Sequence, residues 1–119
     1  MDIPSAVARV RDNIAEAAVQ CGRRPEDIIL VAASKMNSAQ RIQQAIAAGI
    51  AVCGENRVQE MLEKSAMNAY AGAALHFIGH LQKNKVRQVV GLAELIHSVD
   101  SLELLGRIKG NTQIAEFEN

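Results

Sequence analysis

Several features that would restrict the class of this protein are scarce or absent in its sequence. The two cysteines, Cys21 and Cys53, are too few for a disulfide framework, and we expect both to be small buried hydrophobic residues. Lys plus Arg and Asp plus Glu both number 13, so net charge gives no reason to expect nucleic acid as a partner. The N-terminus lacks the pattern of a signal peptide, and no apolar run reaches the length of a membrane span. These absences predict a cytoplasmic protein with no membrane partner.

The spacing of apolar residues predicts a single α/β domain over residues 1–119. It begins with a helix at 4–21, where Pro4 suits the first turn and Gly22 the end. Four strand–helix units follow. The expected strands are residues 28–34, 50–53, 75–78 and 95–99. The expected helices are 38–48, one that carries Val58 and Met61, 84–90, and one that carries Leu102, Leu105 and Ile108 between an Asp100–Ser101 cap and a stop at Gly110–Asn111. The tail, residues 112–119, has two open interpretations, a fifth strand or disorder.

These units predict half of a (β/α)8 barrel, because short connections that each carry one helix require parallel strands and a complete barrel takes about 250 residues. Residues 28–33 form a continuously apolar run, so we expect the strand at 28–34 to be buried on both faces. A half-barrel would expose two strand edges and its inner apolar surface. We therefore expect a homodimer that completes an eight-stranded barrel. The residues expected on the inner surface include Ile29, Val31, Val52, Phe77 and Ile96.

Polar side chains follow each of the four expected strands. Lys35 comes directly after the first, at the end of the sheet where α/β folds place ligands. A lysine that loses hydration there suits Schiff-base chemistry, whereas a lysine after a strand is more often solvated. Asn56, His80 and Asp100 follow the other strands, so the four would line one rim that can hold a polar cofactor. Each of these residues also has a structural interpretation: a helix N-cap for Asn56 and Asp100, and a loop hydrogen bond for His80. The neighbouring Glu55 would be favourable at a helix N-terminus.

Two further groups of residues are assigned no ligand. His76 and His80 are four residues apart, but Ile78 and Gly79 between them suit a strand and a turn, so we do not expect a metal pair. One basic cluster is expected to be the solvated face of a helix, with a phosphate or nucleic-acid patch as the less favoured alternative: Lys83, Lys85 and Arg87.

Four strings of residues, in this order, carry a family resemblance. They are Val-Ala-Ala-Ser-Lys at 31–35, Cys-Gly-Glu-Asn-Arg-Val-Gln-Glu at 53–60, His-Phe-Ile-Gly-His-Leu-Gln-Lys-Asn-Lys at 76–85 and His-Ser-Val-Asp at 97–100. Over residues 4–109 or so, the chain resembles the pyridoxal phosphate homeostasis protein family, whose fold is similar to the N-terminal barrel domain of alanine racemase. The resemblance covers the N-terminal half of that family only.

The resemblance implies that Lys35 carries pyridoxal 5′-phosphate as a Schiff base, with Asn56 and His80 close to the cofactor. It also implies a carrier of the cofactor rather than an enzyme. By resemblance, the phosphate site lies in the C-terminal half of family members. No second glycine-rich loop in this sequence replaces that site, so we expect weak binding. Two alternatives stay open: a remnant that binds nothing, and a racemase-like enzyme, for which no second catalytic acid or base is visible.

Overall fold

The computed structural model describes residues 2–111, so the expectations for the tail at 112–119 lie outside the described residues. Within the described range, helices alternate with the strands of one parallel sheet, whose order is β1-β2-β3-β4. The helices are α1 (Ile3–Gln20), α2 (Ala39–Ala47), α3 (Val58–Ala66), α4 (Val86–Val90) and α5 (Leu102–Asn111), with short 3-10 turns at η1 (Pro25–Asp27) and η2 (Lys83–Lys85). The strands are β1 (Val31–Ala33), β2 (Val52–Glu55), β3 (Ala74–Phe77) and β4 (Leu95–Ile96).

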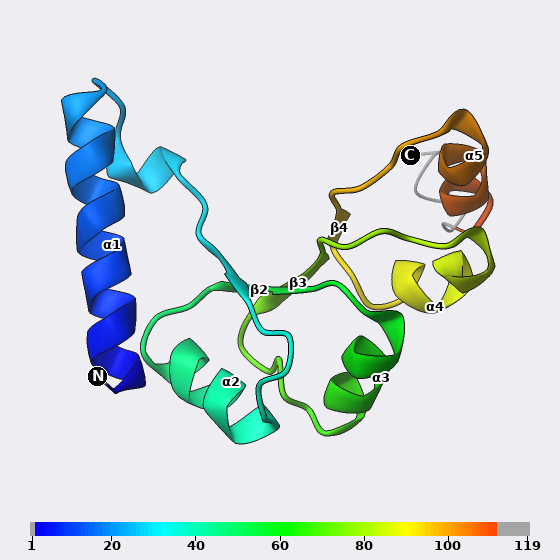
Figure 1. Ribbon diagram of the computed structural model, residues 1–119, viewed down its shortest axis with the longest axis horizontal. Helices are drawn as coiled ribbons and strands as arrows, with labels where there is room; N and C mark the ends of the chain where they lie inside the picture. The colour runs from blue at the N-terminus through cyan, green and yellow to red at the C-terminus, as the bar shows by residue number, and fades with distance from the viewer. Residues whose placement is uncertain (1, 112–119) are drawn as a thin grey trace.

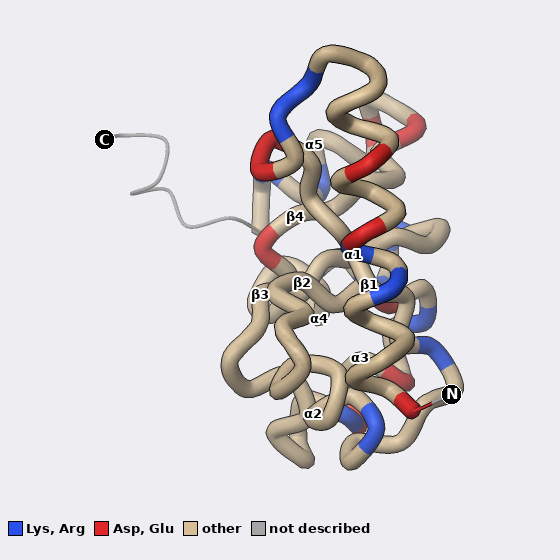
Figure 2. Tube along the Cα trace, turned by 90° about the vertical axis from the view of Figure 1, so that its left-hand side faces the viewer, with Lys and Arg blue, Asp and Glu red and all other residues tan. Residues whose placement is uncertain are grey.

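The expected half-barrel is confirmed. Every neighbouring pair of strands is parallel and in sequence order, as four successive strand–helix units require. The helices fan around the sheet from α1 at one end to α5 at the other (Figure 1). Acidic and basic positions are interspersed along the described chain (Figure 2). Within residues 2–111, no helix is both long and apolar enough to span a bilayer.

Local sequence signals explain the first two helices. Asp2 caps α1 by accepting a 2.8 Å hydrogen bond from the backbone N–H of Ser5, and the helix ends before Gly22, which has a φ of 73°. Ser38 caps α2, because its hydroxyl oxygen accepts a hydrogen bond from the N–H of Arg41 at 3.2 Å. These positions confirm the helices expected at 4–21 and 38–48 to within a residue or two.

The core lies between the sheet and the helices. Cys53, Leu75 and Phe77 point to the helix side, and all three are buried. They pack in one cluster with side chains from α2 to α5, among them Ile42, Met61, Val86, Val89 and Leu104. Burial of Cys53 confirms the expectation for that cysteine, whereas Cys21 is exposed and that expectation is wrong. Cys21 lies past the end of α1, a helix that packs against α2 and η1 instead of the sheet.

Two residues expected on the inner surface face the helices instead. Phe77 has 0% of its surface exposed, and Ile96 pairs with it in register and therefore points the same way. The opposite phase holds for Val31 and Val52, which share the inner side with Gly54. An error of one residue in the phase of a strand moves its whole apolar set to the other face, which explains the wrong assignment.

The first strand is also shorter and more exposed than expected. Residues 28–34 were expected to be buried on both faces, but β1 covers only Val31–Ala33, Ala33 is exposed, and 71% of Ile29 is exposed. The reason is geometric: among residues 2–111, β1 is an edge strand that pairs only with β2.

The last unit departs from its expected pattern in three places. The strand expected at 95–99 ends at Ile96, and Gly110–Asn111 form the end of α5 instead of stopping it earlier. The buried residue of α5 is Leu104, at 1% exposure, whereas Leu102 of the expected apolar face is 87% exposed. The contact with α4 selects the face of Leu104 and Ile108, which lie one turn apart.

Candidate functional site

The structure places Lys35 in the turn between β1 and α2, at the carboxyl end of the sheet. The residue is exposed, so the expected loss of hydration is wrong for the described chain. Lys35 follows an edge strand, so its turn has a neighbouring strand on one side only. The carbonyl oxygen of Lys35 accepts a 3.1 Å hydrogen bond from the Asn37 amide, which ties the turn to the start of α2.

Asn56 lies at the corresponding end of β2, in close contact with the end of β3. A Cβ atom added at Gly79 would lie 2.4 Å from the carbonyl oxygen of Asn56, so only a glycine fits at that position. The side-chain oxygen of Asn56 is buried and has no hydrogen-bond partner among residues 2–111. The N-cap alternative for Asn56 is wrong, because α3 begins after Arg57 and no side chain caps it. The unpaired oxygen is a hydrogen-bond acceptor at the rim.

His80 and Asp100 form the other half of the rim. His80 Nδ1 lies 3.6 Å from Asp100 Oδ2, and both side chains are largely exposed. The hydroxyl of Ser101 accepts a hydrogen bond from the N–H of Leu104 at 3.1 Å. The expected cap of the last helix is therefore confirmed through Ser101 and not through Asp100. Within residues 2–111, no hydrogen bond or ion pair joins these side chains to Lys35.

Beneath the rim lies a buried polar cluster that the sequence analysis missed. The strand expected at 50–53 is β2 (Val52–Glu55), so Gly54 and Glu55 are its last two residues, and Glu55 is 0% exposed. Its Oε2 atom accepts hydrogen bonds from the Ser34 hydroxyl at 2.7 Å and the Tyr70 hydroxyl at 2.6 Å. Lys64, also buried, lies 3.0 Å from the same oxygen. Pairing with a cation is what makes a carboxylate at this depth tolerable.

The environment of this cluster holds two weak acids in their neutral forms. Burial, followed by the hydrogen bond and the negative charge of Glu55, raises the pKa of Tyr70 well above its usual range. Burial, followed by the charge of Glu55, raises the pKa of the Cys53 thiol, which opposes any role for it as a nucleophile. The cluster is therefore structural in its chemistry, with no group prepared to react.

His76 and His80, which were not expected to form a metal pair, each have a different partner. His76 Nδ1 lies 3.0 Å from His97 Nε2, with one ring donating its N–H to the other, while His80 faces Asp100. In the part of the chain that the structure describes, no three His, Cys, Asp or Glu side chains are grouped to hold a metal ion. The basic cluster includes an ion pair between Lys83 and Glu103.

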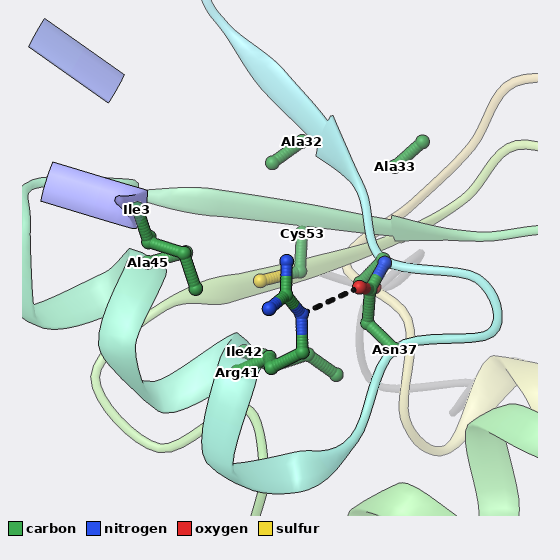
Figure 3. A pocket seen from close by; sticks show the side chains of 9 residues that line it. Ile3, Ala32, Ala33, Asn37, Arg41, Ile42, Ala45 and Cys53 are labelled. Atoms are coloured by element: carbon green, nitrogen blue, oxygen red, sulfur yellow. Dashed lines mark hydrogen bonds between the residues drawn. The ribbon is translucent and has the colours of Figure 1, made fainter. Parts of the chain in front are cut away.

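A small cavity of about 140 Å³ lies on the helix side of β1, beside the Lys35 turn. The guanidinium group of Arg41 donates to the Asn37 side chain at 3.2 Å. In the view of Figure 3, the Cys53 sulfur and Asn37 lie on opposite sides of this guanidinium group. The cavity is smaller than ordinary sites for cofactors, which span about 300–1,000 Å³. We therefore assign the candidate site to the rim, and the cavity only to the packing around α2.

The fold is similar to that of solved structures, and each of the two described here is matched over about half of its own, longer chain. A protein of unknown function from Bifidobacterium adolescentis is 36% identical, with a TM-score of 0.81 over 91% of this chain and 48% of its own. PipY of Synechococcus elongatus with pyridoxal phosphate bound is 38% identical, with a TM-score of 0.66 over 82% of this chain and 47% of its own. The architecture is thus that of one half of a barrel protein.

The curated relatives are named pyridoxal phosphate homeostasis protein. That of Escherichia coli K12 is 43% identical over 110 residues, or 90% of this chain and 47% of the relative. That of Aquifex aeolicus is 37% identical over 109 residues, or 92% of this chain and 48% of the relative. No protein-family model matches the chain. The resemblance to the pyridoxal phosphate homeostasis proteins is confirmed, and the chain spans about half the length of the curated relatives it matches.

Proposed function

We propose that this chain binds pyridoxal 5′-phosphate at the rim of its half-barrel and carries it as a Schiff base on Lys35, without catalytic turnover. The observation that carries the proposal is the position of Lys35 at the carboxyl end of β1, in a sheet that matches a pyridoxal-phosphate-bound PipY structure. The name of the curated relatives supports a role in cofactor homeostasis.

The residues at the rim fit such a ligand. When bound, pyridoxal phosphate supplies an aldehyde that condenses reversibly with a primary amine. The nitrogen of Lys35 forms the new bond to the aldehyde carbon, and the aldehyde oxygen leaves as water. The unpaired side-chain oxygen of Asn56 would accept a hydrogen bond from the ligand. His80, exposed beside Asp100, would be a further polar contact.

The test is reductive trapping with pyridoxal phosphate and borohydride, followed by peptide mapping. The label should appear on the peptide that contains Lys35 and disappear in Lys35→Arg, which keeps the charge but cannot form the imine. Lys85→Arg is the matched control and should label like the wild type. Label concentrated on Lys64, Lys83 or Lys109 would contradict the assignment of Lys35.

We also propose that two copies of the chain associate through their open edges. Among residues 2–111, β1 and β4 are the edge strands. Ile29, just before β1, is 71% exposed, and Leu95, in β4, is 52% exposed. Strand β1 of one copy can lie beside β4 of the other about a two-fold axis that coincides with the barrel axis. Sedimentation should then show a dimer, whereas a well-folded monomer at tens of micromolar would count against the proposal. The cytoplasmic location stays a prediction.

A further inference from the structure

The turn that carries Lys35 has a backbone conformation that costs free energy. Met36, the next residue, has a φ of 62°, in the left-handed region that disfavours residues with a side chain. The Met36 side chain is 89% exposed, so packing does not compensate for this cost. Residues persist in such conformations only where surrounding contacts fix them. The contacts that fix this turn must therefore lie in its backbone.

Two hydrogen bonds hold the residues on either side of Lys35. The Lys64 amine donates to the carbonyl oxygen of Ser34 at 2.7 Å. The backbone N–H of Met36 donates to Oε2 of Glu60. The same Glu60 oxygen lies 2.6 Å from the Lys64 amine. One ion pair therefore holds the chain both immediately before and immediately after Lys35.

The core anchors this ion pair. Glu60 and Lys64 lie one turn apart on α3, and the Lys64 side chain is 7% exposed. The Lys64 amine also contacts Glu55 of β2 at 3.0 Å, and Glu55 accepts further hydrogen bonds from Ser34 and Tyr70. Because Glu60 and Lys64 belong to α3 and Glu55 belongs to β2, the pair is a rigid support for the turn.

The acceptor of the Met36 N–H is charged at neutral pH. Burial acts to raise the pKa of Glu60, but Lys64, the Met36 N–H and Arg57 together bring it below its ordinary value. A hydrogen bond to a charged acceptor is about twice as strong as one between neutral groups. The contact with Glu60 is therefore suited to offset the unfavourable φ of Met36.

We propose that the Glu60–Lys64 ion pair, seated on Glu55, is a positioning device that holds the strained turn and so fixes Lys35 at the rim. Glu60 and Lys64 are positioning residues, since both act through the backbone next to Lys35. The inference rests on the proposed function of Lys35. Without the support, the turn would leave the left-handed conformation for part of the time, and the competent fraction of Lys35 would fall.

Two substitutions of Glu60 separate its acceptor oxygen from its side chain as a whole. Glu60 is not part of the apolar core cluster, and Glu60→Gln also keeps the size of the side chain. In Glu60→Ala, we expect labelling of Lys35 by pyridoxal phosphate and borohydride to fall about tenfold relative to Lys85, and hydrogen exchange at the Met36 amide to accelerate by a similar factor. Glu60→Gln keeps an acceptor oxygen for the Met36 N–H but removes the charge and the ion pair with Lys64, so its loss in both measurements should be intermediate, about threefold.

A second substitution tests whether the strained φ is the cause. Glycine adopts a left-handed φ without strain, so adding Met36→Gly to Glu60→Ala should restore most of the lost labelling. A role of Glu60 limited to general stability would not be rescued, because Met36→Gly adds no contact. Glu103→Ala, which removes an exposed ion pair with Lys83, is the control and should change neither measurement.

The outcomes separate this inference from the proposed function. No label on wild-type Lys35 refutes the proposed function, and hydrogen exchange at Met36 then decides the role of Glu60 in holding the turn. Wild-type labelling with an unchanged Glu60→Ala variant refutes the positioning device alone. Equal losses in Glu60→Ala and Glu60→Gln, or no rescue by Met36→Gly, would also overturn it.

Discussion

Replacement of Lys64 by methionine is the most severe test of the buried cluster, because the change keeps an unbranched side chain that is one atom shorter and removes its charge and donors. The amine donates to Ser34 and Glu55 and pairs with Glu60, and all three contacts are lost. Glu55, with 0% of its surface exposed, keeps hydroxyl donors but loses its cation. Removing one partner of a buried pair costs about 3–5 kcal/mol, a large share of the roughly 5–15 kcal/mol that stabilises a domain.

The assay is urea unfolding followed by circular dichroism, with the midpoint compared at constant slope. Lys83→Met is the matched control, since Lys83 also pairs with a glutamate but 47% of its side chain is exposed, and its midpoint should hardly move. The double variant Glu55→Gln/Lys64→Met should cost about 0.5–3 kcal/mol less than the sum of the single changes. A Lys64→Met midpoint equal to that of wild type, or strictly additive changes, would refute the account of the cluster.

Other measurements test the fold and the rim. Gly79→Ala should destabilise the protein by about 1–3 kcal/mol, because its Cβ would lie 2.4 Å from the backbone oxygen of Asn56. Gly106 lies in α5 with open space around it among residues 2–111, so Gly106→Ala should stabilise the protein by about 0.5–1 kcal/mol. A lower unfolding midpoint for Gly106→Ala than for Gly79→Ala would contradict this structure. Burial, followed by His97, lowers the pKa of His76, so its neutral form is favoured on folding. The contribution of His76 to stability is complete above the ordinary pKa of 6.5 and is lost as pH falls below that value. His76→Gln should therefore reduce the change in the unfolding midpoint between about pH 7.5 and about pH 5.5. Asn56→Ala should weaken binding of pyridoxal phosphate in a spectroscopic titration, and an unchanged titration would remove Asn56 from the site. A side-by-side titration with a full-length relative should show binding weaker by orders of magnitude in this chain, because each charge-assisted hydrogen bond to a phosphate is worth about 1.5–3 kcal/mol, and equal dissociation constants would contradict this.

Local signals made much of the fold predictable. Ser38 and Gly22 mark helix ends through their own backbone and side-chain preferences, which act within a few residues. The short strand–helix units led to the parallel order because topology leaves few alternatives. The phase of the strands was not predictable in the same way. In β3, Leu75 and Phe77 lie on one face and Ala74 and His76 on the other, with Ile78 next, so both faces carry apolar residues and only the pairing in the sheet decides between them.

The site was predictable in position but not in its support. Lys35, Asn56 and His80 follow strands, and strand ends meet at one rim whatever the details of packing. The exposure of Lys35 depends on what covers the inner face, which no local pattern reports. The role of Glu55 depends on Lys64, nine residues later, and on a tyrosine from the following loop. The spacing of Glu60 and Lys64, one turn apart, was the available hint of an ion pair.

Native mass spectrometry of the chain with and without pyridoxal phosphate tests the central claim most directly, because it reports the adduct and the assembly in one spectrum. The account predicts that each chain of a wild-type dimer gains the mass of one cofactor less one water, and that Lys35→Arg gives an unmodified dimer. An adduct of equal abundance in both proteins, or no adduct on the folded wild-type chain at saturating cofactor, would contradict the claim that Lys35 carries the cofactor.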